Sequence, residues 1–148
     1  MLLSPTVLLT QATVLVVDDE APLLRYIGRA LEDSGYHVLR ARSGREALDQ
    51  MRESPFPVQL VVTDVSMPGM TGPELAARIA TEPCPPAVLF VSADHAFLDL
   101  PGPLLRKPFL PGDLSRMVES LLRRAKSPIP STSQDGSEPP AAPLPYAS

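Results

Sequence analysis

The sequence predicts a doubly wound α/β domain built on a five-stranded parallel sheet. Short apolar runs rich in β-branched residues alternate with segments of helical periodicity, and acidic residues come directly after two of these runs. Parallel neighbours need right-handed crossovers, so this alternation favours helices on both faces of the sheet. The patterns alone do not choose the strand order, although the order 2-1-3-4-5 would put the first and third strands side by side.

The first strand and the first helix are expected between residues 13 and 35. Residues 13–17 form a short apolar run that contains three valines. Pro22 is typical of a first helical position, and Gly35 is placed to end the helix. Helical spacing is kept by four apolar residues, Leu23, Leu24, Ile27 and Leu31.

The second strand is expected at 36–40, and a second helix follows it. Ser43 and Glu46 have the spacing of a capping box at the start of this helix. Pro55 then stops the helix, because proline cannot continue it. The apolar positions of the helix are Ala47, Leu48 and Met51.

The third strand, at 60–64, ends in an acid and leads through a turn rich in Gly and Pro into a third helix. In open parallel sheets ligands bind outside the carboxyl ends of the strands, so Asp64 is placed for chemistry. Thr71 and Glu74 form another capping-box pattern, with Pro73 near the first helical position. The apolar positions of this helix are Leu75, Ala76 and Ile79.

The last two strands, at 87–92 and 103–107, end in a hydroxyl and a cation, Ser92 and Lys107. The connection between them is near the minimum length for a crossover and contains a proline, so the fourth helix should be short or missing. A final amphipathic helix carries the apolar residues Leu114, Met117, Val118, Leu121 and Leu122.

Composition divides the 148 residues into one domain with two extensions. Residues 1–11 are an apolar leader without Lys or Arg, interrupted by Ser4 and Pro5, so neither a signal peptide nor a membrane span is favoured. Residues 12–126 hold all the predicted strands and helices. Residues 127–148 are rich in Pro, Ser and Ala, so we expect a disordered tail.

Charge and cysteine content argue against several functional classes. The net charge of -4 does not suit direct nucleic-acid binding, and Arg123, Arg124 and Lys126 are better explained as a solvated helix end. Cys84, the single cysteine, cannot form an internal disulfide, which favours a reducing compartment. We therefore expect a cytoplasmic protein that binds neither nucleic acid nor membrane.

Five polar residues come at the carboxyl ends of four predicted strands: Asp18, Asp19, Asp64, Ser92 and Lys107. Crowded carboxylates repel one another unless a cation lies among them, and an oxygen-only set of this kind suits Mg²⁺. A carboxylate can also attack phosphorus and form an aspartyl phosphate if the charge on the transferred group is neutralised. Lys107 and Ser92 could provide this neutralisation together with the metal.

These motifs, in this order, resemble the receiver domain of two-component response regulators over residues 12–125. The matching motifs are Asp18-Asp19-Glu20, Asp64 with 67–72, Ser92-Ala93 and Lys107-Pro108-Phe109. The resemblance implies a flavodoxin-like fold with strand order 2-1-3-4-5. It also implies a cis peptide bond between Lys107 and Pro108.

The resemblance assigns a role to each site residue. Asp64 would take a phosphoryl group from a phosphohistidine of a sensor histidine kinase or phosphotransfer protein. Asp19, Asp64 and the backbone carbonyl of Ser66 would bind Mg²⁺, and Asp18 would help through a water molecule. Two further side chains would contact the phosphate, Ser92 and Lys107. Such a domain catalyses only its own phosphorylation and dephosphorylation, so we do not expect an enzyme in the ordinary sense.

Two departures from the family pattern, the short connection before the fifth strand and the residue at position 104, leave other interpretations open. Leu104 stands three positions before Lys107, where receivers usually have an aromatic switch residue. A degenerate receiver that acts only as a protein-interaction module is one alternative. A phosphohydrolase of the haloacid dehalogenase type is less favoured, because its nucleophile would follow the first strand in an Asp-x-Asp pattern. With no output domain after the last predicted helix, we expect a monomeric single-domain regulator or the C-terminal receiver of a hybrid kinase.

Overall fold

Five parallel strands form the central sheet of the computed structural model, which describes residues 11–93 and 99–126. The strands are β1 (Thr13–Val17), β2 (His37–Ala41), β3 (Leu60–Asp64), β4 (Ala87–Ser92) and β5 (Leu104–Arg106). Their order is β2-β1-β3-β4-β5, and every neighbouring pair is parallel. The predicted doubly wound, flavodoxin-like fold and its strand order are confirmed.

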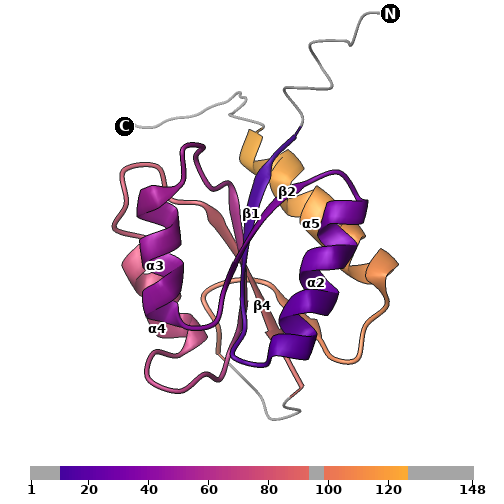
Figure 1. Cartoon of the computed structure of the whole chain (residues 1–148), viewed down its shortest axis with the longest axis horizontal. Coiled ribbons are helices and arrows are strands. Elements are labelled where there is room, and N and C mark those ends of the chain that lie inside the picture. The colour runs from indigo at the N-terminus through magenta and orange to yellow at the C-terminus, as the bar shows by residue number, and fades with distance from the viewer. Residues whose placement is uncertain (1–10, 94–98, 127–148) are drawn as a thin grey trace, which may run out of the picture.

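Four helices in the described part of the chain cover the two faces of the sheet (Figure 1). Helices α2 (Ala21–Asp33) and α5 (Pro111–Lys126) lie on one face, and α3 (Gly44–Glu53) and α4 (Gly72–Ile79) lie on the other. The crossovers after β1, β2 and β3 pass through α2, α3 and α4. Between β4 and β5, residues 93 and 99–103 contain no helix, in agreement with the predicted short or missing fourth helix.

Three helix ends follow their sequence signals. Pro22 lies in the first turn of α2, and Gly35 follows the helix at φ +99°, in the left-handed region that favours glycine. At the start of α4, the Thr71 hydroxyl accepts the N–H of Glu74, and the Glu74 carboxylate accepts the N–H of Thr71. The capping box predicted for α4 is therefore complete.

The capping box predicted for α3 is only half formed. The Ser43 hydroxyl accepts the N–H of Glu46 at 3.1 Å, as expected. The Glu46 carboxylate, however, accepts the N–H of Arg42 at 2.7 Å, one residue before the cap. Glu46 therefore holds the end of β2 as well as the start of α3.

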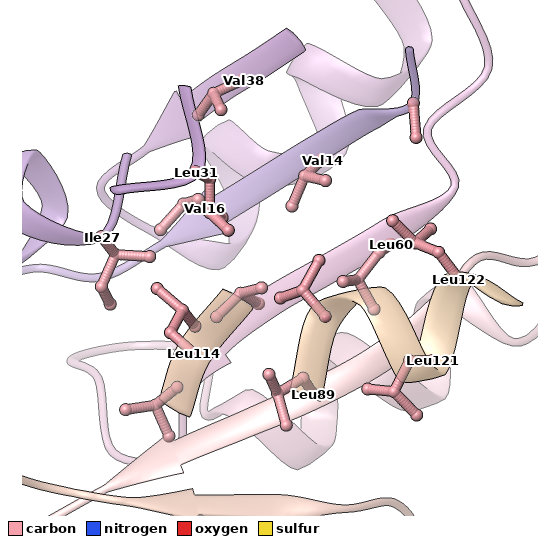
Figure 2. Packing of buried hydrophobic residues seen from close by; sticks show 14 of the residues in the cluster. Val14, Val16, Ile27, Leu31, Val38, Leu60, Leu89, Leu114, Leu121 and Leu122 are labelled. Atoms are coloured by element: carbon pink, nitrogen blue, oxygen red, sulfur yellow. The ribbon is translucent and has the colours of Figure 1, made fainter. Parts of the chain in front are cut away.

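Successive side chains along the strands point to opposite faces of the sheet, so the core has two main layers. The larger layer lies between the sheet and helices α2 and α5 (Figure 2). Its labelled members are Val14, Val16, Ile27, Leu31, Val38, Leu60, Leu89, Leu114, Leu121 and Leu122. The alternate strand residues Leu15, Val17 and Val61 pack on the other face, against α3 and α4. Burial on both faces explains why these strands read as continuous apolar runs.

A third, smaller cluster lies under residues 100–104. Phe90 is fully buried in it, and Leu100 and Leu104 pack against it. A Cβ added to Gly102 would lie 3.3 Å from the Phe90 ring, so the chain passes close over this side chain. Residues 100–102 are therefore held to the sheet by a few direct contacts.

The predicted leader, residues 1–11, and the predicted tail, residues 127–148, fall outside the described residues except for Gln11. Their boundaries remain predictions. Across the two described ranges, no helix combines the length and the apolar character needed to cross a lipid bilayer.

Candidate functional site

The carboxyl edge of the sheet brings together the three acids of the predicted site. Strands β1 and β3 are neighbours and Val17 pairs with Thr63, so the next residues, Asp18 and Asp64, leave the sheet side by side. Asp19 follows in the turn that leads into α2. One carboxylate oxygen from each of the three acids lies within 4.8 Å of the others. The acids that were expected to converge therefore do so.

Asp18 is the most deeply buried of these acids, with 1% of its surface exposed. Its Oδ1 accepts the backbone N–H of Glu20 at 2.8 Å, whereas its Oδ2 has no hydrogen-bond partner among the described residues. Burial raises the pKa of Asp18 from 3.8 to about 6, against the lowering effect of the Glu20 N–H. A buried carboxylate oxygen without a donor is suited to receive a cation.

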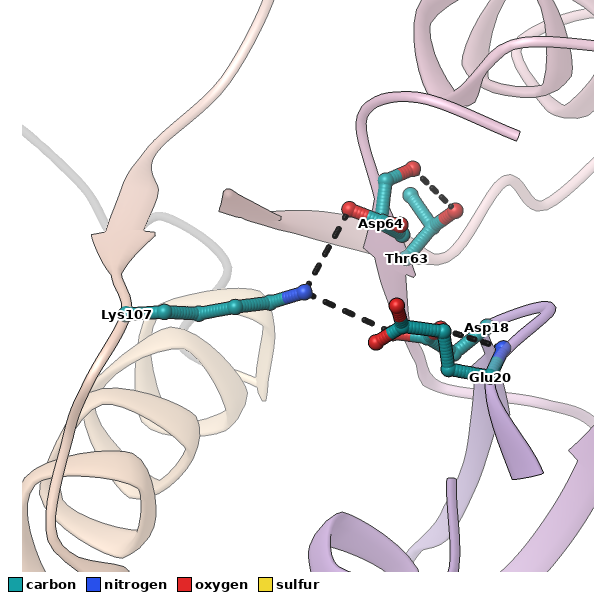
Figure 3. A network of polar contacts seen from close by, with 5 residues as sticks. All are labelled: Asp18, Glu20, Thr63, Asp64 and Lys107. Carbon is teal, nitrogen blue, oxygen red and sulfur yellow. Dashed lines mark hydrogen bonds and ion pairs between the residues drawn. The ribbon is translucent and has the colours of Figure 1, made fainter. Parts of the chain in front are cut away.

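Lys107 reaches into the acidic cluster from the residue after β5 (Figure 3). Its Nζ lies 3.7 Å from Asp64 Oδ1 and 3.8 Å from Asp18 Oδ2. Burial raises the pKa of Asp64, and the charge of Lys107 opposes this rise. Both distances exceed a hydrogen bond, so the ammonium lies between two carboxylates without closing on either.

The donor set fits a hard divalent cation such as Mg²⁺. The cluster holds three carboxylates, and within the described residues the Lys107 ammonium is the one cation that forms ion pairs with any of them, namely with Asp18 and Asp64. Oxygen ligands with an excess of negative charge favour Mg²⁺. Ser66 follows Asp64 by two residues, and its backbone N–H lowers the pKa of Asp64, so this turn lies against the same carboxylate. A metal contact from the Ser66 carbonyl stays a prediction.

Ser92 and Lys107 are joined through the backbone at the ends of β4 and β5. The Lys107 N–H donates to the Ser92 carbonyl at 2.9 Å, and the Lys107–Pro108 peptide bond is cis, as expected. Ser92 is buried and comes directly after Val91, which pairs with Asp64. Ser92 therefore lies at the same sheet edge as the acids, and its contact with a phosphate stays a prediction.

Comparison with known proteins shows that this sequence matches a known protein family. Residues 14–100 match the response regulator receiver domain. The chain is also 36% identical over 117 residues to the response regulator receiver protein CpdR of Brucella abortus (strain 2308), a match that covers 74% of this chain and 95% of CpdR. The chain belongs to the response regulator receiver domain family.

Other proteins similar to this receiver differ widely in length. It is 39% identical over 120 residues to the sensor kinase CckA of Brucella abortus (strain 2308), covering 76% of the receiver chain but 13% of CckA. It is 31% identical over 133 residues to the alkaline phosphatase synthesis transcriptional regulatory protein PhoP of Bacillus subtilis (strain 168), covering 84% of the chain and 54% of PhoP. The chain thus spans about half or less of these two relatives.

Solved structures agree with the family assignment. A response regulator receiver domain protein from Clostridium thermocellum is similar with a TM-score of 0.65 at 30% identity, and the match covers 78% of this chain and 97% of that one. The chemotaxis response regulator CheY4 of Vibrio cholerae is similar with a TM-score of 0.64 at 29% identity, covering 76% and 99%. The receiver therefore shares the family's sequence and its fold.

Arg42 lies next to the site of the receiver, although the sequence analysis did not single it out. It directly follows β2, and its Nη2 donates to the backbone carbonyl of Asp19 at 3.2 Å. The Glu46 carboxylate holds the N–H of Arg42. A signal was present in the sequence, since Arg42 follows a strand at the same sheet edge as Asp64.

Gly72 is a second residue whose part in the site was missed, because it was considered only as a turn residue. A Cβ added to Gly72 would collide with the backbone carbonyl oxygen of Asp64. The Gly72 N–H donates to the Val65 carbonyl at 2.8 Å, which closes the turn after β3. Gly72 is therefore a positioning residue, since any side chain there would displace the backbone of Asp64.

Proposed function

We propose that this receiver accepts a phosphoryl group on Asp64 from a phosphohistidine of a sensor histidine kinase or a phosphotransfer protein. The observation that carries the proposal is the Lys107 ammonium 3.7 Å from Asp64 Oδ1, in a cluster with two more carboxylates. The Asp64 side chain keeps 13% of its surface exposed, so a donor can reach it. We assign the receiver domain to residues 12–126, between a leader and a tail.

In the proposed reaction, a carboxylate oxygen of Asp64 attacks the phosphorus atom of the phosphohistidine. The O–P bond forms as the N–P bond breaks, and the imidazole nitrogen leaves with the electron pair of that bond. The Lys107 ammonium offsets negative charge on the transferred group, and the Ser92 hydroxyl would donate a hydrogen bond to it. The chain is thereby a phosphoacceptor that turns over no separate substrate.

The proposed Mg²⁺ site uses oxygen atoms from the loops after β1 and β3. Asp19, Asp64 and the Ser66 carbonyl would bind the ion directly, and Asp18 would bind it through water. When bound, the ion supplies positive charge beside the transferred oxygens. The buried Asp18 Oδ2 without a donor supports this site, because such an oxygen gains from a nearby cation or from a water that the cation holds.

A groove beside Lys107 is the proposed docking place for the phosphoryl donor. The groove has a volume of about 510 Å³, and its walls include Pro22, Leu23, Tyr26, Pro108 and Phe109. The Tyr26 hydroxyl donates to the Phe109 carbonyl at 3.2 Å, and the two rings lie 6.0 Å apart between centroids. These contacts join α2 to the loop before α5, so the groove offers a continuous apolar wall to a partner helix.

Phosphorylation would switch partner binding by adding charge and acceptor oxygens at this sheet edge. Lys107 is tied to Ser92 through the backbone, so a Lys107 that turns toward the phosphate also acts on the ends of β4 and β5. Leu104 packs against the cluster of Phe90 in place of an aromatic switch residue. We infer that the conformational change on phosphorylation of this receiver depends on aliphatic packing around Phe90.

The relatives suggest two contexts for the receiver. The match covers nearly all of CpdR, whereas it covers a small part of the sensor kinase CckA. We propose that the chain works as a single-domain regulator or as the receiver part of a hybrid kinase, as a monomer in the cytoplasm and without direct contact to nucleic acid. The exposed free thiol of Cys84 supports a reducing compartment.

A receiver that only binds partners, without phosphorylation, is the second candidate. The observation in its favour is Leu104, which removes the aromatic residue that usually couples phosphorylation to output. The two candidates differ in whether Asp64 becomes an acyl phosphate. A direct chemical test therefore separates them.

The test is incubation with acetyl phosphate and Mg²⁺, followed by measurement of the intact mass. We expect the wild type to gain one phosphoryl group and Asp64→Asn to gain none. Asp33→Asn, which changes an exposed aspartate at the end of α2, is the matched control and should gain the group like the wild type. Hydroxylamine should remove the adduct, because it cleaves acyl phosphates and leaves phosphate esters of hydroxyl groups intact.

Other outcomes would support the alternatives. A folded wild type without any adduct would favour the interaction module. Repeated turnover of a small phosphate ester by the wild type, but not by Asp64→Asn, would favour a phosphohydrolase.

A further inference from the structure

Two of the residues proposed to bind Mg²⁺ directly lie beyond the paired ends of the strands. Asp64 ends β3 and pairs with Val91, so the sheet holds its backbone. Asp19, in contrast, comes two residues after the end of β1, and Ser66 comes two residues after the end of β3. Strand pairing therefore does not by itself set the separation between Asp19 and Ser66, and contacts outside the sheet must do so.

The end of β2 holds the loop after β1. Asp18 donates its backbone N–H to the Ala41 carbonyl at 3.1 Å. Arg42, the next residue after Ala41, donates from Nη2 to the Asp19 carbonyl at 3.2 Å. The carboxylate of Glu46 in α3 accepts the Arg42 N–H at 2.7 Å. The loop that carries Asp18 and Asp19 is therefore tied to the start of α3.

Met70 ties the loop after β3 to the same start of α3. A Cβ added to Gly44, the first residue of α3, would lie 2.5 Å from Met70 Sδ and 2.9 Å from Met70 Cβ. The methionine side chain therefore lies directly on the glycine backbone. Met70 also packs against the core layer shared by α3 and α4, which lie side by side (Figure 1). The Gly72 N–H closes this loop on the Val65 carbonyl at 2.8 Å.

We propose that Met70 is a positioning residue for the Mg²⁺ site, because its contact with Gly44 fixes the loop that carries Ser66 relative to the loop that carries Asp19. Without this contact, the ion would have to order the loop on binding, and such ordering costs affinity. This role of Met70 rests on the Mg²⁺ site of the proposed function. Met70 itself does not touch the ion, since a thioether is a soft ligand and Mg²⁺ favours hard oxygen ligands.

The affinity of the metal-free full chain for Mg²⁺ tests this role without any phosphoryl donor. Stepwise addition of Mg²⁺ to the ¹⁵N-labelled protein should shift the amide signals of the loop after β3, and the midpoint of these shifts gives the dissociation constant. We expect Met70→Ala to weaken binding about tenfold, in the range found when residues that support metal ligands are removed. Met70→Leu keeps the apolar volume and should bind within about twofold of the wild type.

Met51→Ala is the matched control. Met51 is half-buried like Met70, packs against the same core layer and lies in the last turn of α3, far along the helix from Gly44. The same truncation should therefore lower the melting temperature to a similar extent but leave the Mg²⁺ affinity unchanged. An equal loss of affinity in both variants would assign the effect to general stability and overturn the proposal.

A double-mutant cycle tests whether the effect passes through Gly44. Gly44→Ala pushes its new Cβ against Met70, so we expect it to weaken binding about as much as Met70→Ala does. Combining the two changes removes Met70 Sδ and Cγ from the collision, so the double variant should bind no more weakly than either single variant. Losses that add, to about 100-fold, would show that the two residues act separately and overturn the proposal.

The rate of phosphorylation provides a second readout. A residue that only positions the Mg²⁺ site changes the Mg²⁺ concentration that is needed, and it leaves the reaction of the occupied site unchanged. Acetyl phosphate should therefore phosphorylate Met70→Ala at the wild-type rate once Mg²⁺ is saturating. A rate that stays low at saturating Mg²⁺ would give Met70 a part in the reaction itself and overturn the proposal.

The outcomes separate this role of Met70 from the proposed function. Wild-type Mg²⁺ affinity in a folded Met70→Ala variant would overturn the role of Met70 alone. Absence of Mg²⁺ binding by the wild type would overturn the Mg²⁺ site and the role of Met70 with it. Weakened binding in Met70→Ala, together with a wild type that gains no phosphoryl group, would support the role of Met70 and overturn the proposed phosphorylation.

Discussion

The Nζ of Lys107 lies 3.7 Å from Oδ1 of Asp64, although Asp64 ends β3, Lys107 follows β5, and β4 lies between these two strands. This distance lets the ammonium attract the carboxylate while leaving room for the carboxylate to act as a nucleophile. A phosphoryl group added to Asp64 would bring its oxygens toward the same ammonium. Before any phosphorylation, the Lys107 ammonium therefore already lies next to the carboxylate that the proposed reaction would modify.

Replacement of Lys107 should slow phosphorylation more than it changes the fold. We expect Lys107→Ala to lower the rate of adduct formation from acetyl phosphate about 100-fold, since it removes a preorganised charge at the reacting group. Lys126→Ala, at the end of α5, is the matched control and should keep the wild-type rate. The rate is measured from the growth of the phosphorylated mass. Equal rates in Lys107→Ala and the wild type would remove Lys107 from the proposed mechanism.

The raised pKa of Asp18 should make the metal-free protein less stable as the pH rises. Folding raises this pKa from 3.8 to about 6, so between these values the folded state binds a proton that the unfolded state releases. The free energy of unfolding therefore falls through this window, by about 3 kcal/mol for the full shift, and stays lower above it. The raised pKa of Asp64 acts in the same direction.

Urea unfolding without divalent ions, from about pH 4 to pH 7, measures this loss. Asp18→Asn should flatten the pH dependence, because the amide does not titrate. A free energy of unfolding that rises with pH over the same window in the wild type would contradict the burial of a charged Asp18.

Added Mg²⁺ should stabilise the folded protein most above pH 6, because Asp18, whose pKa is about 6, then carries its negative charge. A ligand at 100 times its dissociation constant that binds only the folded state contributes about 2.7 kcal/mol to the free energy of unfolding. Asp19→Asn should lose most of this gain, because it removes one of the three clustered carboxylates. Equal stabilisation of both proteins by Mg²⁺ would indicate a general effect of ionic strength.

A side chain at position 72 should disturb the backbone that carries Asp64. In Gly72→Ala the new Cβ collides with the Asp64 carbonyl oxygen, so we expect a loss of about 1–3 kcal/mol of stability, as for other overpacked sites, and slower phosphorylation. Gly112→Ala adds the same atom in the first turn of α5, where the nearest group is the flexible end of Arg116. This control should be neutral or slightly stabilising. Similar melting temperatures for the two variants would show that the turn after Asp64 yields easily.

Arg42 should tune the response to Mg²⁺ through the Asp19 backbone. We expect Arg42→Ala to change the Mg²⁺ concentration that gives half-maximal phosphorylation by about threefold or more, because it removes the hydrogen bond that holds the Asp19 carbonyl. Arg42→Lys keeps the charge and should restore part of the response. Arg45→Ala, an exposed change in the first turn of α3, is the control. An unchanged Mg²⁺ dependence in Arg42→Ala would show that Arg42 has no part in the response to Mg²⁺.

The convergence of Asp18, Asp64 and Lys107 could be predicted because parallel strands leave their carboxyl ends at one edge, and side-chain type at those ends is visible in the sequence. The half-formed cap of α3 could not be predicted, since Ser43 and Arg42 offer similar N–H groups to Glu46 and spacing does not distinguish them. The burial of Asp18 could not be predicted from the sequence either. It depends on the turn through Glu20 and on its packing, which local patterns do not report.

The close approach of Gly72 to Asp64 was also invisible in the sequence, because it follows from the path of the turn in three dimensions. Two other features were visible in the sequence, namely Leu104 in place of an aromatic residue and the short connection before β5. In the structure, both features involve the cluster around Phe90. Leu104 and Leu100 both pack against the cluster of Phe90, so an aliphatic contact joins the connection to the edge strand.

β5 forms one border of the sheet and contains only three residues, with Pro103 directly before it. A short border strand preceded by a residue without an N–H presents few open backbone groups to a neighbouring molecule. A rearrangement of this border on the proposed phosphorylation would therefore carry little risk of strand-to-strand polymerisation, even in a crowded cell.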